Sequence, residues 1–432
     1  MGAFLQLFKE LFLILTTGYI IFLFLYDYRK ALIWYLSLFS FISAIGLSRV
    51  TYNEYALIPL MLLFVLVTKQ VRIFRPNILY IVLFIYMIAL TYTNGQAVVD
   101  TNSGGKYLFI ILLIYSSHLF SNPNYALKII FLIWVITLCI AISFLIYGDG
   151  IFNVSNISTD DRSILLQTGI EGAGENDLNY FSSGQAIGAI ITLLFIIYHR
   201  FMLAELSVPI ILKKILESEI FRIALFLILS IQIWFVFRSL SRGGILVFIA
   251  GVFSLVYLMK KKKYFLYGGL FLIAVYLILN QVGIIDLLLE RIDGDSSVTS
   301  GRNVIFLGAL GAVYNQGGIL QILFGGGIDW PWYEYWASNF FGSKAFASTH
   351  NQWISLFMIF GILGLILFLI PFVKSIHHCL KNPNPINNFR IVLLSCVFTM
   401  FLSLEPLIYT PYVWFVLALA ATYTPNLKKK SN

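Results

Sequence analysis

Charged residues are scarce in this sequence: only 11% of the 432 residues are Asp, Glu, Lys or Arg, whereas 59% are hydrophobic. A chain with so few charges cannot hide its apolar side chains in a water-soluble core of ordinary size. The mean hydropathy of +0.88 points the same way. The composition therefore indicates an integral membrane protein.

Cysteine is also scarce, with Cys139 and Cys396 inside apolar runs and Cys379 in a basic segment. This distribution excludes a disulfide framework and a CxxC metal site, and we expect neither a metal nor another cofactor. The amino terminus lacks the basic start and cleavage site of a secretory signal, so its first apolar run is expected to remain as a span.

Long apolar runs are abundant, and they lack the alternating pattern of an outer-membrane barrel. They predict an all-α polytopic membrane protein with about 12 or 13 membrane-spanning helices in a single domain over residues 1–432. The expected spans lie near residues 11–26, 31–47, 55–68, 77–93, 107–120, 129–147, 179–198, 223–237, 243–259, 264–281, 352–373, 391–404 and 408–424.

Lysine and arginine gather in short segments between these spans, which the positive-inside rule places in the cytoplasm. The net charge of +9 is thereby explained without a nucleic-acid partner. The basic segments are 69–76, 199–214, 260–263, 377–390 and 428–430. Three segments are then expected outside, namely 148–178, 237–244 and a long loop at 282–350 that carries short helices. The side of the amino terminus stays open, because the first three spans fit either topology.

His350 is the one histidine that this topology places on the outer side, at the mouth of the predicted span 352–373. Its ordinary pKa lies near neutrality, which suits a base that takes a proton from an attacking sugar hydroxyl. The alternative is an inert interfacial histidine that bonds to Thr349 or Asn351. Asn351 is itself a candidate substrate-binding residue.

Four of the arginines expected on the outer side are candidate site residues, where an anionic partner would offset their cost at membrane depth. Arg242 precedes two glycines at the start of a predicted helix, so a phosphate can approach closely. For Arg238, snorkelling to lipid headgroups is the simpler interpretation and substrate contact the alternative. Arg302 follows a Ser-Gly turn, opens an amphipathic helix and can clamp a diphosphate. Arg162 is the sole cation of its loop.

Glycines and aromatic residues fill the loop between Arg302 and His350. The glycines of LFGGGID (323–329) permit a turn that brings backbone amides near a ligand. Trp332 and Tyr335 offer stacking surfaces for sugars, although an aromatic belt at the bilayer interface is the competing interpretation.

Three motifs in order, SRGGILVFIAG, SGRNVIFLGAL followed by LFGGGID, and STHNQWISLFMIFGILGLILFL, resemble the bacterial O-antigen ligase and O-antigen polymerase family. The likeness covers roughly residues 225–372. GENDLNYFSSG (174–184) is similar to the Asn-containing start of an earlier span in that family, which implies a substrate contact at Asn179.

The resemblance implies a metal-independent glycosyltransferase of the multi-span (GT-C-like) type in the bacterial inner membrane, with its active site on the periplasmic side. The donor would be an undecaprenyl-diphosphate-linked glycan and the acceptor a second glycan, with membrane lipid around the enzyme and a chain-length regulator as an optional protein partner. The family's essential arginines correspond to Arg242 and Arg302, and its histidine to His350.

Polymerase and ligase stay open as alternatives, because Arg162 and Arg302 lack the glycine found at the usual offset in some polymerases. We favour a polymerase that joins repeat units over a ligase that transfers the glycan to lipid A-core or protein. A flippase for the same lipid-linked sugar is the rival from another class. It is disfavoured at this point, because the long predicted spans are free of ionisable residues and helix breaks.

Overall fold

Helices make up almost all of the chain that the computed structural model describes, which is residues 19, 22–23, 78–93, 119–147, 178–205, 210–239, 241–259, 262–281, 283–286, 302–327, 351–404 and 411–423. None of these residues lies in a β-strand. The all-helical prediction is confirmed for this part of the chain. Apart from residues 19 and 22–23, the first three predicted spans lie outside it, as does the predicted span 107–120 except for residues 119 and 120.

Most of the helices described from residue 78 onward overlap the predicted spans, and the largest differences are the carboxyl end of α18 and the amino ends of α6 and α19. The helices are α4 (Ile78–Thr93), η2 (Leu119–Ser121), α6 (Pro123–Tyr147), α8 (Leu178–Ile197), α9 (His199–Glu205), α10 (Ile210–Glu217), α11 (Glu219–Arg238), α12 (Arg242–Leu258), α13 (Lys262–Gln281), α15 (Arg302–Ala312), the π-helical η4 (Val313–Gly317), α16 (Gly318–Phe324), α18 (Gln352–Lys381), α19 (Pro385–Met400) and α21 (Pro411–Ala420).

Three of the described helices are long and apolar enough to cross a membrane: Pro123–Ile142, Glu219–Arg238 and Gln352–Lys381. A fourth candidate is the pair Phe181–Ile197 and His199–Glu205, which bends by 85°. These helices support the prediction of a membrane protein.

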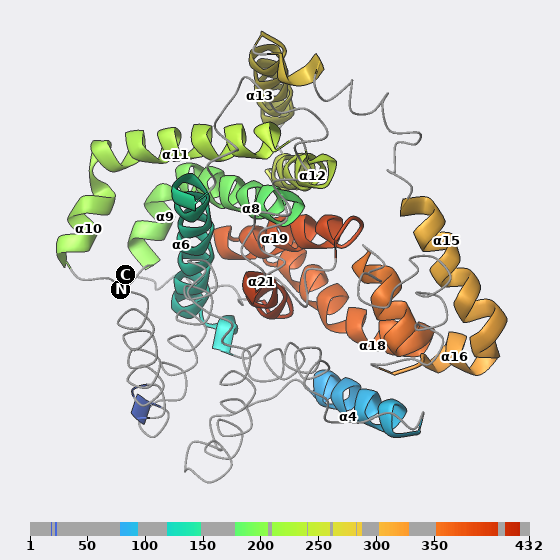
Figure 1. The fold of residues 1–432 in the computed structure, drawn as a ribbon. Coiled ribbons are helices and arrows are strands. Elements are labelled where there is room, and N and C mark those ends of the chain that lie inside the picture. Colours follow the sequence, from blue (N-terminus) through green and yellow to red (C-terminus); the bar gives the residue numbers. More distant parts are fainter. Residues whose placement is uncertain are drawn as a thin grey trace, which may run out of the picture.

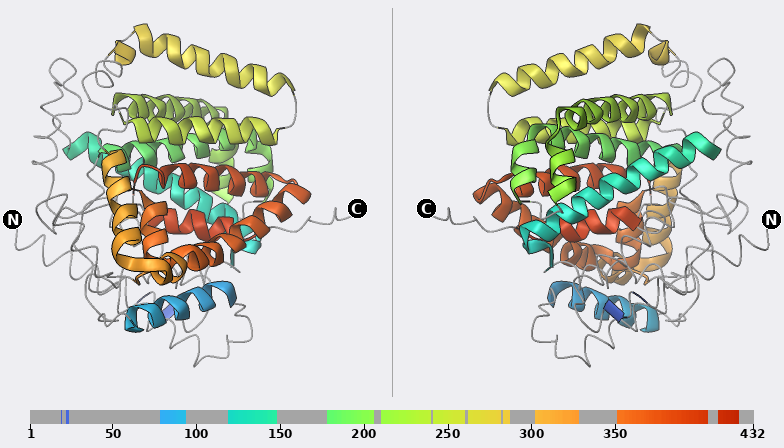
Figure 2. Two further views of the ribbon diagram at one scale, coloured as in Figure 1. Left: turned by 90° about the vertical axis from the view of Figure 1, so that its right-hand side faces the viewer. Right: turned by 90° about the vertical axis from the view of Figure 1, so that its left-hand side faces the viewer.

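The longer helices lie in stacked layers, with α13 at one edge, then α11, α12 and α8, then α19, α21 and α18, and α4 at the opposite edge (Figures 1 and 2). α6 crosses these layers obliquely, and α15 stands at a steep angle beside the end of α18. α8 occupies the middle and packs against α6, α11, α12 and α19.

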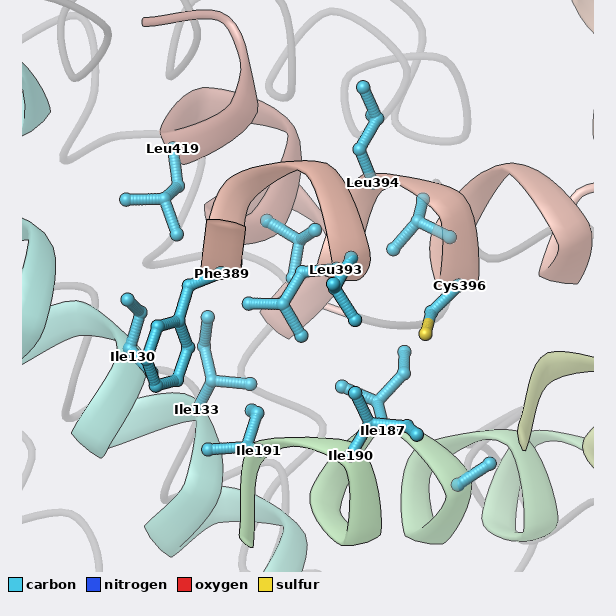
Figure 3. Packing of buried hydrophobic residues seen from close by; sticks show 14 of the residues in the cluster. Ile130, Ile133, Ile187, Ile190, Ile191, Phe389, Leu393, Leu394, Cys396 and Leu419 are labelled. Carbon is cyan, nitrogen blue, oxygen red and sulfur yellow. The ribbon is translucent and has the colours of Figure 1, made fainter. Parts of the chain in front are cut away.

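Large side chains fill the centre, where α6, α8 and α19 meet (Figure 3). Phe389 of α19 lies beside Ile130 and Ile133 of α6, and all three are fully buried. Gly251 of α12 lets Ile190 and Cys396 approach, since a Cβ at that position would lie 2.6 Å from Ile190 Cγ1. Lipid tails are as apolar as leucine, so close packing of this kind, rather than escape from water, holds such helices together.

Two predicted basic loops are mostly helical, which corrects the sequence interpretation. Segment 377–390 contains the end of α18 and the start of α19, and only residues 382–384 join them. Asn384 caps α19 by accepting a hydrogen bond from Asn387 N at 2.9 Å, and Pro385 follows at the first helical position. Segment 199–214 likewise contains α9 and much of α10. The basic residues predict loops between spans, whereas the helices continue through these segments.

Candidate functional site

α12 begins at Arg242, as predicted, because Ser241 caps it. The Ser241 backbone is extended (φ −87°, ψ 110°), and its Oγ accepts a hydrogen bond from Gly244 N at 3.3 Å. The same hydroxyl donates to Asn179 Oδ1 at 2.9 Å. Two predicted site residues, Asn179 at the start of α8 and Arg242 at the start of α12, are thus brought together by a residue that the sequence analysis did not select.

The start of α12 is wedged between α8 and the end of α19. A Cβ on Gly243 would lie 2.6 Å from Ser403 Oγ, and a Cβ on Gly244 would overlap Ser182 Oγ. The two glycines were predicted to let a phosphate or another backbone approach. In the structure, serines from two other segments take that space.

α18 starts at the same end of the bundle. Asn351 caps it, with Oδ1 accepting from Trp353 N at 3.0 Å and Ile354 N at 3.2 Å, while Nδ2 donates to Leu402 O at 3.3 Å. Gln352 N donates to Phe401 O and Leu404 O. The amino end of α18 therefore sits on the turn that holds Ser403, so Asn351 shares this end with Asn179 and Arg242. We call this end, defined by Asn179, Ser241, Arg242, Ser403 and Asn351, the capped end.

Arg238 lies in the last turn of α11, three residues before the Ser241 cap. Its side chain is only 8% exposed, and within the described part of the chain its Nη2 is buried without a hydrogen-bond partner. The preferred prediction, that Arg238 snorkels to lipid headgroups, is therefore wrong for this structure. Nη2 therefore remains as a donor for an anionic ligand.

The amino ends of α8, α12 and α18 converge at the capped end, and the dipole of each helix contributes partial positive charge there. The carboxyl ends of α11 and α19 lie there too, with opposite partial charge, but donors of Asn351 and Gln352 already occupy the carbonyls of Phe401, Leu402 and Leu404. Together with Arg238 and Arg242, the local balance favours an anion.

Four predicted site residues lie outside the described residues: His350, Arg162, Trp332 and Tyr335. Of these, His350 is fixed in the sequence directly before the Asn351 cap. Arg302 opens α15, which confirms the predicted helix start, and its side chain lies outside the description. Ala309 is fully buried on that helix, in agreement with the predicted apolar face.

The Gly-rich motif behaves differently from its prediction. Gly326 N donates to Met358 O at 2.9 Å and Gly327 N to Ile359 O at 3.1 Å, so these amides serve α18 and not a ligand. α18 is also broken at Gly361 (φ 64°, ψ −173°). This break corrects the expectation that the long spans are uninterrupted.

Buried polar side chains form a seam between α6, α8 and α11. Thr192 bonds to Gln232 Oε1 at 2.7 Å and receives the Trp134 indole N–H at 2.8 Å, while Gln185 Nε2 donates to Thr137 O at 2.9 Å. Gln185 Oε1 and Gln232 Nε2 are buried without hydrogen-bond partners among the described residues. This seam carries no charge, so it offers hydrogen bonds rather than ion binding.

Two contributors escaped the sequence analysis for different reasons. Ser241 had a readable signal, since a serine before a helix start is a common cap. Ser403 had none, because it reaches the capped end only through the packing of α19 against α12.

Comparison of the chain with protein-family models, with curated proteins and with solved structures found no match. Within the described ranges, no group of three or more His, Cys, Asp and Glu side chains is placed to hold a metal ion. The capped end, with its converging helix starts and arginines, is therefore the feature that points to a function.

Proposed function

We propose that this chain is a bacterial inner-membrane glycosyltransferase that joins undecaprenyl-diphosphate-linked repeat units into a surface polysaccharide. The observation that carries the proposal is the capped end, which brings Asn179, Arg242 and Asn351 to one end of the bundle. These three residues come from separate parts of the sequence. The last turn of α11 leads to this end, and Nη2 of Arg238 in that turn is buried without a partner among the described residues.

The chemistry needs little more than such a site. A glycosyl diphosphate already carries its leaving group, so the protein must stabilise the departing negative charge and exclude water. Arg238 and Arg242 would bind the diphosphate, and Arg302, the first residue of α15, would supply a third cation. No metal is needed for this step, because guanidinium groups and helix ends supply the positive charge.

The second requirement is a base for the acceptor hydroxyl. His350 directly precedes Asn351, whose position at the capped end is given by its bonds to α18 and to Leu402. An imidazole there would take the proton as the acceptor oxygen attacks the anomeric carbon and the diphosphate leaves. Trp332, Tyr335, Asn179 and Arg162 would hold the sugars.

The orientation follows from charge. The junctions at the other end of the bundle carry Arg200, Lys262, Lys381 and Arg390, which by the positive-inside rule belong to the cytoplasm. The capped end would then face the periplasm, where lipid-linked repeat units are joined. A ligase that transfers the same glycan to lipid A-core or protein uses this chemistry with another acceptor and remains the first alternative.

A flippase for the lipid-linked sugar is the second alternative, and one observation favours it. Transporters often contain broken helices and buried polar groups near the middle of the membrane. The break at Gly361 and the uncharged seam around Gln185 and Gln232 are features of that kind. The capped end favours the transferase, because a chemical step needs a concentrated anion site.

The test is glycosyl transfer by purified protein in liposomes that contain a lipid-diphosphate-linked oligosaccharide, with products separated by gel. We expect wild-type protein to lengthen the glycan, and Arg242→Gln and His350→Ala to reduce the rate by about 10²-fold or more. Arg222→Gln is the matched control, because this arginine is exposed on α11 and pairs with Glu219 at 2.7 Å. Translocation without any change of glycan length would replace the transferase by the flippase.

A further inference from the structure

The break in α18 leaves backbone groups that an intact helix would pair. Gly361 has non-helical dihedrals (φ 64°, ψ −173°), so residues 352–360 and residues 362–381 form two helical pieces. Carbonyls just before such a break lose their helical donors, and in apolar surroundings they must find others. The groups that donate hydrogen bonds to these carbonyls therefore hold the two pieces in place.

The segment Gly325–Gly327, which is neither helix nor strand, supplies two of the missing donors. Gly326 N and Gly327 N bond to Met358 O and Ile359 O, at 2.9 Å and 3.1 Å. Gly325 has φ 82°, and its backbone touches that of Gly361 so closely that a Cβ on either residue would meet main-chain atoms. Only glycine combines this conformation with this approach.

The Tyr86 hydroxyl joins both sides of the break. It lies 2.5 Å from Phe324 O, at the end of α16, and 3.1 Å from Phe360 O, just before the break. Its ring packs where Gly364 leaves room, since a Cβ there would lie 2.8 Å from Tyr86 Cε1. One side chain of α4 therefore ties α16 to the first piece of α18.

These two elements lead to two predicted site residues. α15, η4 and α16 form a continuous segment that begins at Arg302 and ends at Phe324. The first piece of α18 begins directly after Asn351, with His350 before it. The Tyr86 contact thus lies where the segment that carries Arg302 meets the helix that follows His350.

We propose that Tyr86 is a positioning residue, whose hydroxyl sets the segment of Arg302 against the helix of His350 for the transfer step. This inference rests on the proposed function. Because the Tyr86 hydroxyl is engaged with two backbone carbonyls, its effect is expected on the rate of the bound complex and not on affinity. Small displacements of reacting groups have large effects on rate. The π-helical turn at Val313–Gly317 belongs to the same segment, and such turns are frequent at functional sites.

Tyr86→Phe is the decisive variant, because it removes one hydroxyl and leaves the ring. Tyr92→Phe is the matched control on the same helix, with a side chain that is 75% exposed. Hydrogen exchange of reconstituted protein would report on the joint, and we expect faster exchange at Gly326 and Gly327 in Tyr86→Phe only. Unchanged exchange in Tyr86→Phe would overturn the role of the hydroxyl at the break.

Steady-state transfer with the lipid-linked oligosaccharide reports on positioning. We expect Tyr86→Phe to lower kcat by about 10-fold, with KM for the donor within about twofold of wild type. A loss confined to the amount of folded protein, or a rise in KM at unchanged kcat, would overturn positioning. If wild-type protein transfers no sugar, the proposed function fails, whereas the exchange result still decides whether Tyr86 holds the break.

Discussion

Two buried arginines occupy opposite ends of the bundle, and their surroundings differ. Arg390, 1% exposed, donates from Nη1 to Thr422 Oγ1 at 2.5 Å and from Nη2 to the carbonyl of Phe120. Arg238, 8% exposed, has a buried Nη2 without a partner in the described chain. Arg390 joins α19 to η2 and to Thr422 just beyond α21, so it serves the fold. Each arginine has one buried nitrogen without a partner among the described residues, but in Arg390 this is Nε and both terminal nitrogens are engaged, whereas in Arg238 it is the terminal Nη2, which is the better placed donor for a ligand.

Arg390→Ala tests the structural half of this comparison and should have the largest effect. The change removes buried packing and leaves Thr422 Oγ1 and Phe120 O without their donors, so we expect a loss of about 3 kcal/mol in the free energy of unfolding. The free energy of unfolding is measured by titrating the protein in mixed micelles with SDS. Arg222→Ala, on an exposed ion pair, should cost under about 1 kcal/mol. Equal losses in both variants would contradict the role of Arg390.

Arg238→Met tests the other half. Methionine keeps the apolar stem and removes Nη2, which has no hydrogen-bond partner among the described residues, so we expect the free energy of unfolding to change by less than about 1 kcal/mol in either direction. The rate of glycosyl transfer should nevertheless fall by about 10²-fold, because the departing diphosphate loses a cation. If Arg238→Met unfolds readily, or if it keeps full activity, then Arg238 does not have the ligand-binding role that separates it from Arg390.

Gly244→Ala tests whether the capped end is close-packed around the start of α12. The added Cβ would overlap Ser182 Oγ, whose hydroxyl donates to Val236 O at 3.2 Å, so we expect a loss of about 1–3 kcal/mol. Gly269→Ala is the control, since no atom lies within 4 Å of its Cβ position, and here we expect a small gain. The same SDS titration compares them. If both variants gain stability, the capped end is not close-packed.

Asn351→Ala should cost less stability than Arg390→Ala or Gly244→Ala, and unlike Arg238→Met it tests no cation at the site. It removes the cap of α18 and the bond to Leu402 O, which together should cost about 1 kcal/mol in the free energy of unfolding. Asn351→Asp keeps the capping oxygen and should recover most of that loss. Failure of Asp to recover stability would show that the contact with α19, and not the cap, matters at this end.

Several helix starts and three residues of the capped end were predictable from the sequence. The sequence placed the starts of α12, α15 and α18 within a residue or two, because apolar runs and residues such as Ser, Gly and Asn at their edges are local signals. It also selected Asn179, Arg242 and Asn351, which the structure brings to one end. It failed at Arg238 and at Gly326, where the outcome depends on which other segment packs nearby.

The break at Gly361 shows why the remainder was not predictable. FGILG reads as an ordinary apolar helix with two glycines, and hydropathy gives it a continuous span. The break exists because Gly325–Gly327 and Tyr86 replace the lost helical bonds, and Tyr86 is 238 residues away from Phe324. No local pattern carries that information.

The sequence by itself determined that this protein belongs in a membrane, that its described part is helical, and where most of those helices begin. Hydropathy adds along a run, and helical hydrogen bonds join residues four apart, so both are properties of short segments. Only the tertiary structure decided that Asn179 meets Ser241, 62 residues away, that Arg238 is buried without a bond from Nη2, and that Tyr86 joins two distant elements. Those results depend on which helices pack together, because a buried polar group is satisfied by whatever neighbour the packing brings to it.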